Sequence, residues 1–385
     1  MSLRTNLATL EIWGLTGVLT YQFYGRDYEM KIVFLSYLHG FGGAEKQIIM
    51  LANAMVERGH DVTLISICAD NNCYFLDERV KYIFLPDRQK GILRIAGRYQ
   101  DIKEKLKELR PDATVSFWFQ SAYLTAAMPK SITGKVIYSE RGDPGDKEYK
   151  GFLGIVRKMT LPHIDGFVFQ SRGAQKYFNS KVQKRSAVIP NPVFVNAEDF
   201  PEVHVRRKAI VTVGRLHPQK NQKLLIDAFA MIASQIPEYT LEIYGDGELK
   251  ETLQKQINDL NLAERAHLKG TSKQIHKLIY DASLFVLSSD YEGLPNTLLE
   301  AMSLGIPSIS TDCKPGGARE IIQDGVTGII TPIGDKEKLA EAIMCLLSDK
   351  QKGQKMADKA RISMSHFTPA RVYDKWEKAL SCNEW

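Results

Sequence analysis

The sequence predicts an α/β protein built from two doubly wound domains, each around a parallel sheet. Three observations support this fold class. The chain has 385 residues, which is too long for one ordinary hydrophobic core. Short apolar runs of strand length alternate with amphipathic segments of helix length. The alternation stops at the polar, Pro-punctuated stretch 193–207 and restarts at Ala209, so that stretch is the expected linker.

This division gives five expected segments: 1–29, 30–192, 193–207, 208–366 and 367–385. The first is an upstream extension or a misjudged start, because Met30 leads directly into an apolar run like a fresh protein start. The second and fourth are the two domains, joined by the linker. The last carries apolar side chains at helical spacing and should form a helix that faces a core.

A βαβ unit opens the N-terminal domain. It has a strand at 31–37, a helix at 44–58 and a second strand at 61–67. Gly42 and Gly43 lie in the loop after the first strand, at the edge where open parallel sheets bind ligands. The loop is not G-x-G-x-x-G and no acidic residue follows at the Rossmann spacing, so a dinucleotide is disfavoured. The glycines would let backbone approach a ligand closely, or would simply form a tight turn.

The rest of the N-terminal domain continues the alternation. Further strands are expected at 112–119, 135–139 and 164–170. Glu140 and Arg141 directly follow the second of these, at another strand end. A charged cluster in that position would line a cleft on the ligand-binding edge.

The C-terminal domain repeats the pattern. Strands are expected at 209–213, 240–244, 266–269, 284–288, 307–310 and 328–331. Helices are expected at 222–236 and 335–347. Two such domains facing each other enclose a cleft, and clefts between domains are preferred sites for small molecules.

Four charged side chains follow strands of the C-terminal domain. Arg215 and Lys220 share one loop and suit a pyrophosphate, since the guanidinium binds one phosphate as a fork and the ammonium binds the other as a point charge. Glu292 and Glu300 flank an expected helix start, and each carboxylate would accept the hydroxyl groups of a ribose or hexose. The free N–H groups of that helix start suit a phosphate. A sugar linked to a nucleoside diphosphate needs this set of groups.

Plainer interpretations of these residues remain open. Thr297 to Glu300 fits a capping box, in which Glu300 would only cap its helix. Arg215 and Lys220 would then be ordinary surface charges. We find no D-x-D pair and no His/Cys cluster at metal-ligand spacing, so no metal or cofactor is expected. Arg215, Lys220 and helix N-termini would instead neutralise a departing diphosphate.

The positive charge is concentrated in the first domain. The chain carries +6 overall, and residues 30–195 alone carry +9. A basic half should meet a membrane surface, a phosphorylated lipid or a nucleic acid, unless it is merely solvated. Residues 88–110 form a basic amphipathic segment, typical of an interfacial helix or of a surface helix packed on a sheet. The five scattered cysteines indicate free thiols in a reducing cytoplasm.

Several of these residues together resemble family 4 of the retaining glycosyltransferases, which have the GT-B architecture. The resemblance rests on Gly214-Arg215 with Lys220-Asn221, and on the run from Glu292 to Met302 followed by Gly305-Ile306-Pro307. Gly42 to Glu45 and Ile189 to Pro192 also resemble the family's N-domain loop and hinge. The similarity extends over about residues 30–380.

The resemblance implies transfer of a hexose or N-acetylhexosamine from a nucleotide sugar, UDP-linked, with retention at the anomeric carbon and without a metal. The catalytic residues would be Glu292, Arg215 and Lys220. Arg215 and Lys220 would bind the diphosphate and stabilise the leaving group, Glu292 would contact the donor sugar, and Glu300 would hold the ribose. The remaining donor-side residues would be Gly42, Gly43, Gly293, Leu294, Asn296 and Thr297. Many members place an N-domain histidine near the reacting centre, whereas this sequence has Trp118-Phe119-Gln120 at that strand end.

On the acceptor side the resemblance assigns Glu140 and Arg141, together with a polyprenyl-diphosphate-linked glycan. The enzyme would then be cytoplasmic and peripheral on the inner face of the membrane, with contact through the basic N-domain and no nucleic acid partner. The last segment would cross back onto the N-domain. Two alternatives stay open: a nucleotide-sugar epimerase or hydrolase of the same fold, and a non-catalytic nucleotide-sugar sensor.

Overall fold

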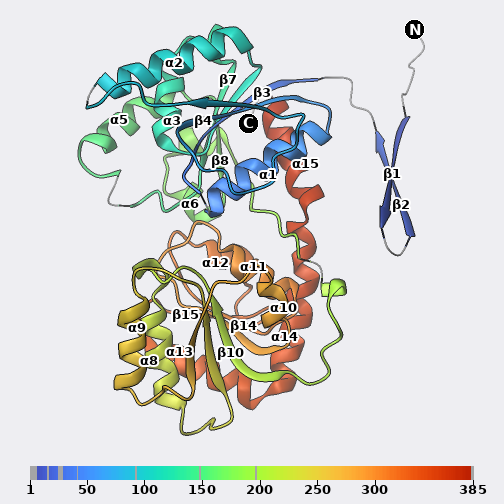
Figure 1. Ribbon diagram of the computed structural model, residues 1–385, viewed down its shortest axis with the longest axis vertical. Helices are drawn as coiled ribbons and strands as arrows, with labels where there is room; N and C mark the ends of the chain where they lie inside the picture. The colour runs from blue at the N-terminus through green and yellow to red at the C-terminus, as the bar shows by residue number, and fades with distance from the viewer. Residues whose placement is uncertain are drawn as a thin grey trace.

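The computed structural model describes residues 7–14, 17–24, 29–40, 42–91, 93–146, 149–195 and 197–382. It confirms the predicted fold class, because two α/β domains with parallel sheets lie one above the other (Figure 1). Within residues 1–29, β1 (Leu7–Gly14) pairs antiparallel with β2 (Gly17–Tyr24). Whether these residues are an extension or a misjudged start remains a prediction.

The N-domain sheet has seven parallel strands in the order β5-β4-β3-β6-β7-β8-β9. They are β3 (Lys31–Leu38), β4 (Asp61–Asp70), β5 (Lys81–Leu85), β6 (Ala113–Ser116), β7 (Lys135–Glu140), β8 (Gly166–Phe169) and β9 (Ser186–Val188). The helices are α1 (Gly43–Glu57), α2 (Leu93–Leu109), α3 (Phe119–Ala126), α4 (Lys130–Thr133), α5 (Phe152–Thr160), α6 (Arg172–Lys176) and α7 (Ser180–Gln183). Successive residues of β3 enter different cores, Phe34 with α1 and Leu35 with α2, so the strand is apolar on both faces.

The C-domain sheet has six parallel strands in the order β12-β11-β10-β13-β14-β15. They are β10 (Arg207–Val213), β11 (Thr240–Tyr244), β12 (Ala266–Gly270), β13 (Ala282–Leu287), β14 (Ser308–Thr311) and β15 (Ile329–Thr331). The helices are α8 (Gln222–Ile232), α9 (Lys250–Asp259), α10 (Ile275–Ile279), α11 (Asn296–Ser303), α12 (Gly317–Ile321), α13 (Lys336–Ser348) and α14 (Lys350–Ser363). Because β10 and β13 are neighbours, the loops after them open side by side.

The strand expected at 112–119 is shorter than predicted. β6 ends at Ser116, and α3 already begins at Phe119. Residues 113–117 and Phe119 are all buried, so hydropathy alone did not reveal where extended backbone gives way to helix. The helix expected at 222–236 likewise ends early, at Ile232. The basic segment 88–110 forms α2, which buries Ile102 and Leu106 against the sheet in the manner of an ordinary surface helix.

The last helix, α15 (Pro369–Ser381), packs on the N-domain although it follows the C-domain in sequence (Figure 1). The Trp376 ring lies 5.9 Å from that of Phe117, centre to centre. Arg58 of the N-domain pairs with Asp374 at 3.4 Å. The helix therefore joins the C-domain, which it follows in sequence, to the N-domain, on which its apolar face is buried.

The two domains also meet at glycine-lined contacts beside the strand ends. A Cβ added to Gly293 would lie 2.4 Å from the carbonyl oxygen of Arg141. A Cβ on Gly173 would lie 1.6 Å from the carbonyl oxygen of Pro315. Backbone oxygens of one domain thus touch the backbone of the other, which only glycine permits.

We expect Trp376→Ala to destabilise the N-domain by about 3–5 kcal/mol, because it removes a fully buried aromatic side chain that joins α15 to the sheet. Urea unfolding monitored by circular dichroism measures this change. Lys375→Ala, at an exposed position on the same helix, is the control and should leave the midpoint within error. An equal effect of both variants would contradict the proposed packing.

We expect Gly293→Ala to force the domains apart, because the new methyl group meets a backbone oxygen that has little room to move. The radius of gyration from small-angle X-ray scattering should increase. Gly43→Ala is the matched control, since its methyl group would meet only the side-chain nitrogen of Asn296, at 3.5 Å. If Gly293→Ala scatters like the parent chain, the contact does not limit domain closure.

Candidate active site

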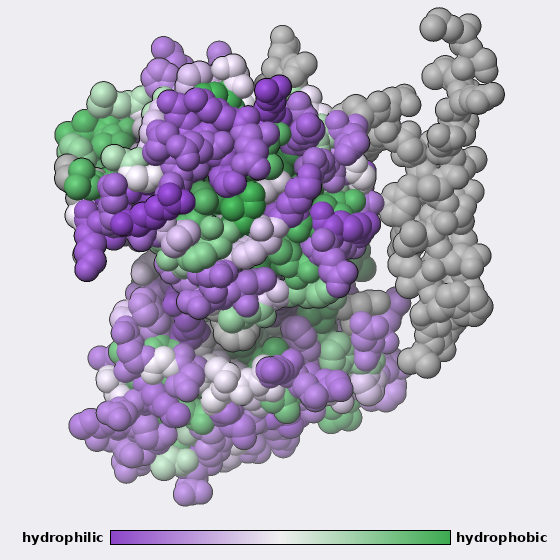
Figure 2. Space-filling view, turned by 45° about the horizontal axis from the view of Figure 1, so that its top comes forward, coloured by the Kyte–Doolittle hydropathy of each residue, from purple (hydrophilic) through white to green (hydrophobic). Residues whose placement is uncertain are grey.

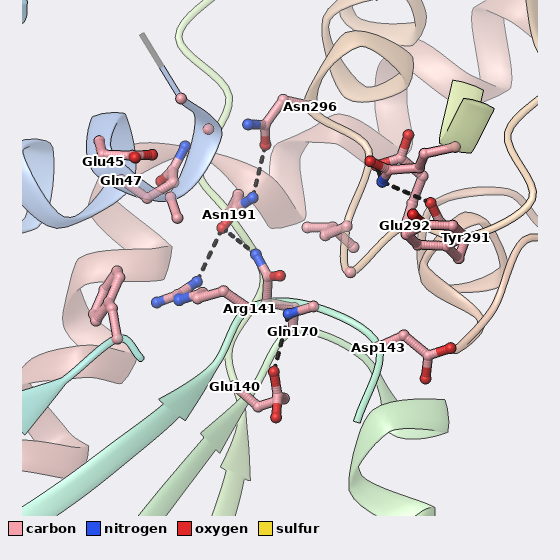
Figure 3. Close-up of a pocket in the computed structure, with 18 of the residues that line it drawn as sticks. Glu45, Gln47, Glu140, Arg141, Asp143, Gln170, Asn191, Tyr291, Glu292 and Asn296 are labelled. Atoms are coloured by element: carbon pink, nitrogen blue, oxygen red, sulfur yellow. Dashed lines mark hydrogen bonds between the residues drawn. The ribbon is translucent and has the colours of Figure 1, made fainter. Parts of the chain in front are cut away.

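A cleft of about 780 Å³ lies between the domains, at the carboxyl ends of both sheets (Figure 3). Eleven of the twelve predicted site residues line it: Gly42, Gly43, Glu140, Arg141, Arg215, Lys220, Glu292, Gly293, Leu294, Asn296 and Thr297. The two N-domain pairs lie where β3 leads into α1 and where β7 ends. The others come from the loops after β10 and β13 and from the first turn of α11.

Lys220 and Glu292 form a direct ion pair across neighbouring loops. The hydroxyl of Ser289 donates to the same carboxylate at 2.9 Å. The loops are also joined by backbone, since the amide of Asp290 donates to the carbonyl of Gln219 at 2.9 Å. Both charged side chains are more than four-fifths buried, so the pair is shielded from water, and each charge would need a new partner if the other left.

Arg215 is exposed in the same cleft. Within the described residues no carboxylate comes within ion-pair distance of the Arg215 guanidinium. The Lys220 ammonium, by contrast, pairs with Glu292. Its loop is held by close backbone contact, because a Cβ on Gly245 would lie 1.9 Å from the carbonyl oxygen of Gly214. After the loop, Asn221 adopts the left-handed conformation (φ 44°) and caps α8. Arg215 is therefore a cation available to an anionic ligand.

The start of α11 points its first residues into the cleft. Pro295 precedes the helix, and among the described residues no side chain caps it. Thr297 consequently lies inside the first turn, and its buried hydroxyl has no partner within the described part of the chain. The capping-box alternative for Thr297 and Glu300 is wrong, because Pro295 starts the helix before Thr297 could serve as its cap.

Glu300 is not among the residues that line the cleft. Its carboxylate lies 3.2 Å from Nε2 of His276 on α10. It is also 4.0 Å from Nζ of Lys46 on α1, so it meets a cation of the opposite domain. The predicted ribose contact of Glu300 stays a prediction.

The N-domain wall presents Arg141, whose guanidinium lies 4.0 Å over the Phe117 ring. Burial lowers the pKa of Arg141 to about 9. Its Nη1 donates to the side-chain oxygen of Asn191 at 3.1 Å, and Asn191 donates in turn to Asn296 of the C-domain at 2.7 Å (Figure 3). Arg141 is therefore a poorly solvated cation, and through Asn191 it also takes part in a hydrogen-bonded link between the domains.

Glu140, next to it, is already engaged. It accepts from the hydroxyl of Tyr138 at 2.7 Å and lies 3.6 Å from Arg157. The backbone amide of Gly142 donates to its other oxygen at 3.1 Å. Glu140 and Arg141 therefore have different surroundings. The Glu140 carboxylate is hydrogen-bonded and ion-paired within its own domain, whereas the Arg141 side chain lines the cleft without a carboxylate partner among the described residues.

Sequence reasoning missed other residues that line the cleft, among them His39, Glu45, Tyr74, Asp143, Gln170, Asn191 and Tyr291. His39 could have been found, because it stands just before Gly42 in the glycine-rich loop. It is an N-domain histidine, but it follows β3 rather than β6, where Trp118 lies. The sequence indicated Asn191 only as part of the hinge. Its position between Arg141 and Asn296 depends on how the domains dock.

The described residues also bear on the expected absence of a metal and of a membrane span. No three His, Cys, Asp or Glu side chains gather there in a way that could hold a metal ion. The absence of a metal requirement nevertheless stays a prediction. None of the helices described is both long and apolar enough to cross a membrane.

Comparisons with known proteins agree with this geometry. The family model for group 1 glycosyl transferases matches residues 196–363, and that for glycosyltransferase family 4 matches residues 41–196. Together they span the cleft-forming parts of both domains.

Two bacterial relatives match this chain over nearly their full length. The first, from Campylobacter jejuni, is an α-1,4-N-acetyl-D-galactosaminyltransferase whose name specifies an undecaprenol-diphosphate-linked acceptor. It is 25% identical over 359 residues, covering 91% of this chain and 98% of the relative. The amylovoran biosynthesis glycosyltransferase AmsD from Erwinia amylovora is 24% identical, with 91% and 99% covered.

Solved structures share the fold. Anabaena HepE in complex with UDP and glucose matches with a TM-score of 0.72 at 21% identity, covering 92% of this chain and all of HepE. The lipopolysaccharide outer core galactosyltransferase WaaB matches with a TM-score of 0.71 at 23% identity, with 91% and 99% covered. With both family models matched and this architecture in place, the chain belongs to the family 4 glycosyltransferases, enzymes of the GT-B fold.

Proposed function

We propose that the enzyme transfers a hexose or N-acetylhexosamine, with retention and without a metal, from a UDP-sugar to a polyprenyl-diphosphate-linked glycan. The observation that carries the proposal is the convergence of Arg215, Lys220 and Glu292 on one cleft between the domains. A pyrophosphate needs cations, and a sugar needs hydroxyl acceptors, within a few ångströms of each other. The cleft brings both together.

The proposed donor site exchanges one ion pair for another. A diphosphate would draw Lys220 from Glu292, and the freed carboxylate would accept sugar hydroxyls. Arg215 would take the second phosphate, and the first-turn N–H groups of α11 with the hydroxyl of Thr297 would complete the cradle. As the glycosidic bond breaks, these groups stabilise the departing charge. The donor-binding set further includes Gly42, Gly43, Gly293, Leu294, Asn296 and Glu300.

The acceptor side is proposed from the N-domain wall. Arg141 is a half-buried cation that lines the cleft, and no carboxylate among the described residues pairs with it. An acceptor diphosphate would supply the missing charge, and Glu140 would hold its place through Arg157. The C. jejuni relative is named for an undecaprenol-diphosphate-linked acceptor, which supports a lipid carrier here. With such a substrate, the enzyme would lie peripherally at the inner face of the membrane.

The test combines donor binding and transfer. A panel of nucleotide sugars is screened by thermal shift, since a bound donor stabilises by mass action. The best donor is then incubated with an undecaprenyl-diphosphate-linked acceptor in the presence of EDTA, and NMR reads the anomeric configuration of the product. We expect transfer with retention. Product formed from donor alone would favour an epimerase or hydrolase, and binding without turnover would favour a sensor.

We expect Lys220→Ala and Arg215→Ala each to lower kcat about 100-fold or more, because each removes a cation that meets the leaving diphosphate. Initial rates at saturating donor measure this loss. Lys223→Ala, at an exposed position on the adjoining helix, is the matched control and should keep the parent rate. Equal rates for all three variants would remove the diphosphate assignment.

Glu300→Gln tests the proposed ribose contact. If the carboxylate accepts the ribose hydroxyls, the variant should bind UDP about 10-fold to 100-fold more weakly, the usual weight of a hydrogen bond to a charged group. Its affinity for 2′,3′-dideoxy-UDP should match that of the parent chain. An equal loss for both nucleotides would mean that Glu300 acts only through His276 and Lys46.

A further inference from the structure

The outer face of α5 carries large apolar side chains that are exposed. Phe152 is 80% exposed, Ile155 57% and Met159 69%. They lie three and four residues apart, so they form one stripe along the helix. Figure 2 shows hydrophobic surface at the left edge of the N-domain, the side on which Figure 1 places α5. A contiguous exposed stripe of large apolar side chains marks an interaction surface.

The segment that carries this stripe has charges of one sign, although Glu148 and Asp165 flank it in the sequence. The segment 149–164 contains Lys150, Arg157 and Lys158 and no acidic residue. Lys150 and Lys158 are exposed beside the apolar side chains. The surrounding domain carries +9 over residues 30–195. An apolar helix face with a basic rim is complementary to an anionic bilayer, whose headgroups meet the lysines while the acyl region receives the apolar side chains.

The basic helix α2 fits a bilayer less well. Its buried face packs on the sheet, and its cations are partly neutralised: Arg98 pairs with Asp87 at 2.6 Å and Lys105 with Glu108 at 2.8 Å. α5 has only one inward cation, Arg157, whose guanidinium donates to the carbonyl of Pro144 at 2.8 Å. The apolar stripe of α5 is therefore the better membrane contact.

The inner face of α5 leads directly to the reaction cleft. Arg157 lies 3.6 Å from Glu140 and 4.2 Å from the centre of the Tyr149 ring. Glu140 and Tyr149 both line the cleft. A bilayer touching the outer face of α5 would thus lie one helix away from the N-domain wall, where the acceptor is expected.

We propose that Phe152, Ile155 and Met159 of α5 insert into the headgroup region of an anionic membrane and present the acceptor side of the cleft to its surface. The inference deepens the proposed function and rests on it for the lipid-linked acceptor. Membrane binding itself is measured independently of catalysis.

The test uses the full-length chain and sedimentation with vesicles of phosphatidylglycerol and phosphatidylethanolamine, and with vesicles of phosphatidylcholine alone. The variant replaces Phe152, Ile155 and Met159 by serine, which removes apolar area at exposed positions without adding charge. We expect the parent chain to prefer the anionic vesicles, and the triple variant to bind them roughly tenfold or more weakly. Lys150→Glu with Lys158→Glu should weaken binding to anionic vesicles alone.

Two control variants separate α5 from other exposed apolar residues. Leu93→Ser with Ile95→Ser alters the exposed start of α2, and Ile362→Ser alters the C-domain. Both should bind vesicles like the parent chain. The inference is overturned if the triple variant keeps its affinity, if the α2 variant loses as much, or if the parent chain ignores anionic vesicles. It is also overturned if the triple variant converts a dimer into a monomer in light scattering, because the stripe would then face a second copy.

Thermal shift with UDP-sugars on each variant distinguishes this failure from failure of the proposed function. An unchanged donor shift with lost vesicle binding supports the inference. Vesicle binding that depends on α5 without any donor shift would uphold the membrane contact and refute the transferase proposal.

Discussion

The ion pair between Lys220 and Glu292 is the interaction on which the cleft depends. It joins the loops after β10 and β13, which are adjacent strands of one parallel sheet. A buried pair of this kind is costly to break by removing one charge, yet exchanging one partner for another anion costs little. The cleft thus keeps its cation and its hydroxyl acceptor in place because each neutralises the other. A ligand that carries both phosphate and sugar satisfies both at once.

Sequence reasoning found this part of the site for a topological reason. In a doubly wound sheet, ligands bind at the carboxyl ends of the strands, so residues that follow apolar runs share one edge whatever their separation along the chain. This rule alone was enough to predict that Arg215 and Glu292 lie in the same cleft. The rule was not enough for Glu300, because the direction of a helical side chain depends on where its helix starts. Pro295 moved that start, and the carboxylate faces His276 and Lys46.

The opposite wall was harder to predict, because its arrangement arises only when the domains dock. Asn191 links Arg141 to Asn296 through hydrogen bonds that cross between domains, and no periodicity encodes a contact of that kind. α5 escaped notice for a different reason. Its short segment contains Gly154 and begins after Gly151 without a capping side chain, so it lacks the usual start signals of a helix.

The docking contacts also explain why the two arginines of the cleft differ. Arg215 is exposed and held by a loop of its own domain, where the backbone of Gly214 approaches Gly245. Arg141 lies at the contact between the domains, because its backbone oxygen meets Gly293 and its guanidinium is linked to Asn296 through Asn191. Desolvation has already lowered its pKa to about 9, so an anion placed beside it regains interaction energy that water no longer supplies. This poorly solvated cation lies on the wall that α5 supports from behind, through the contact of Arg157 with Glu140.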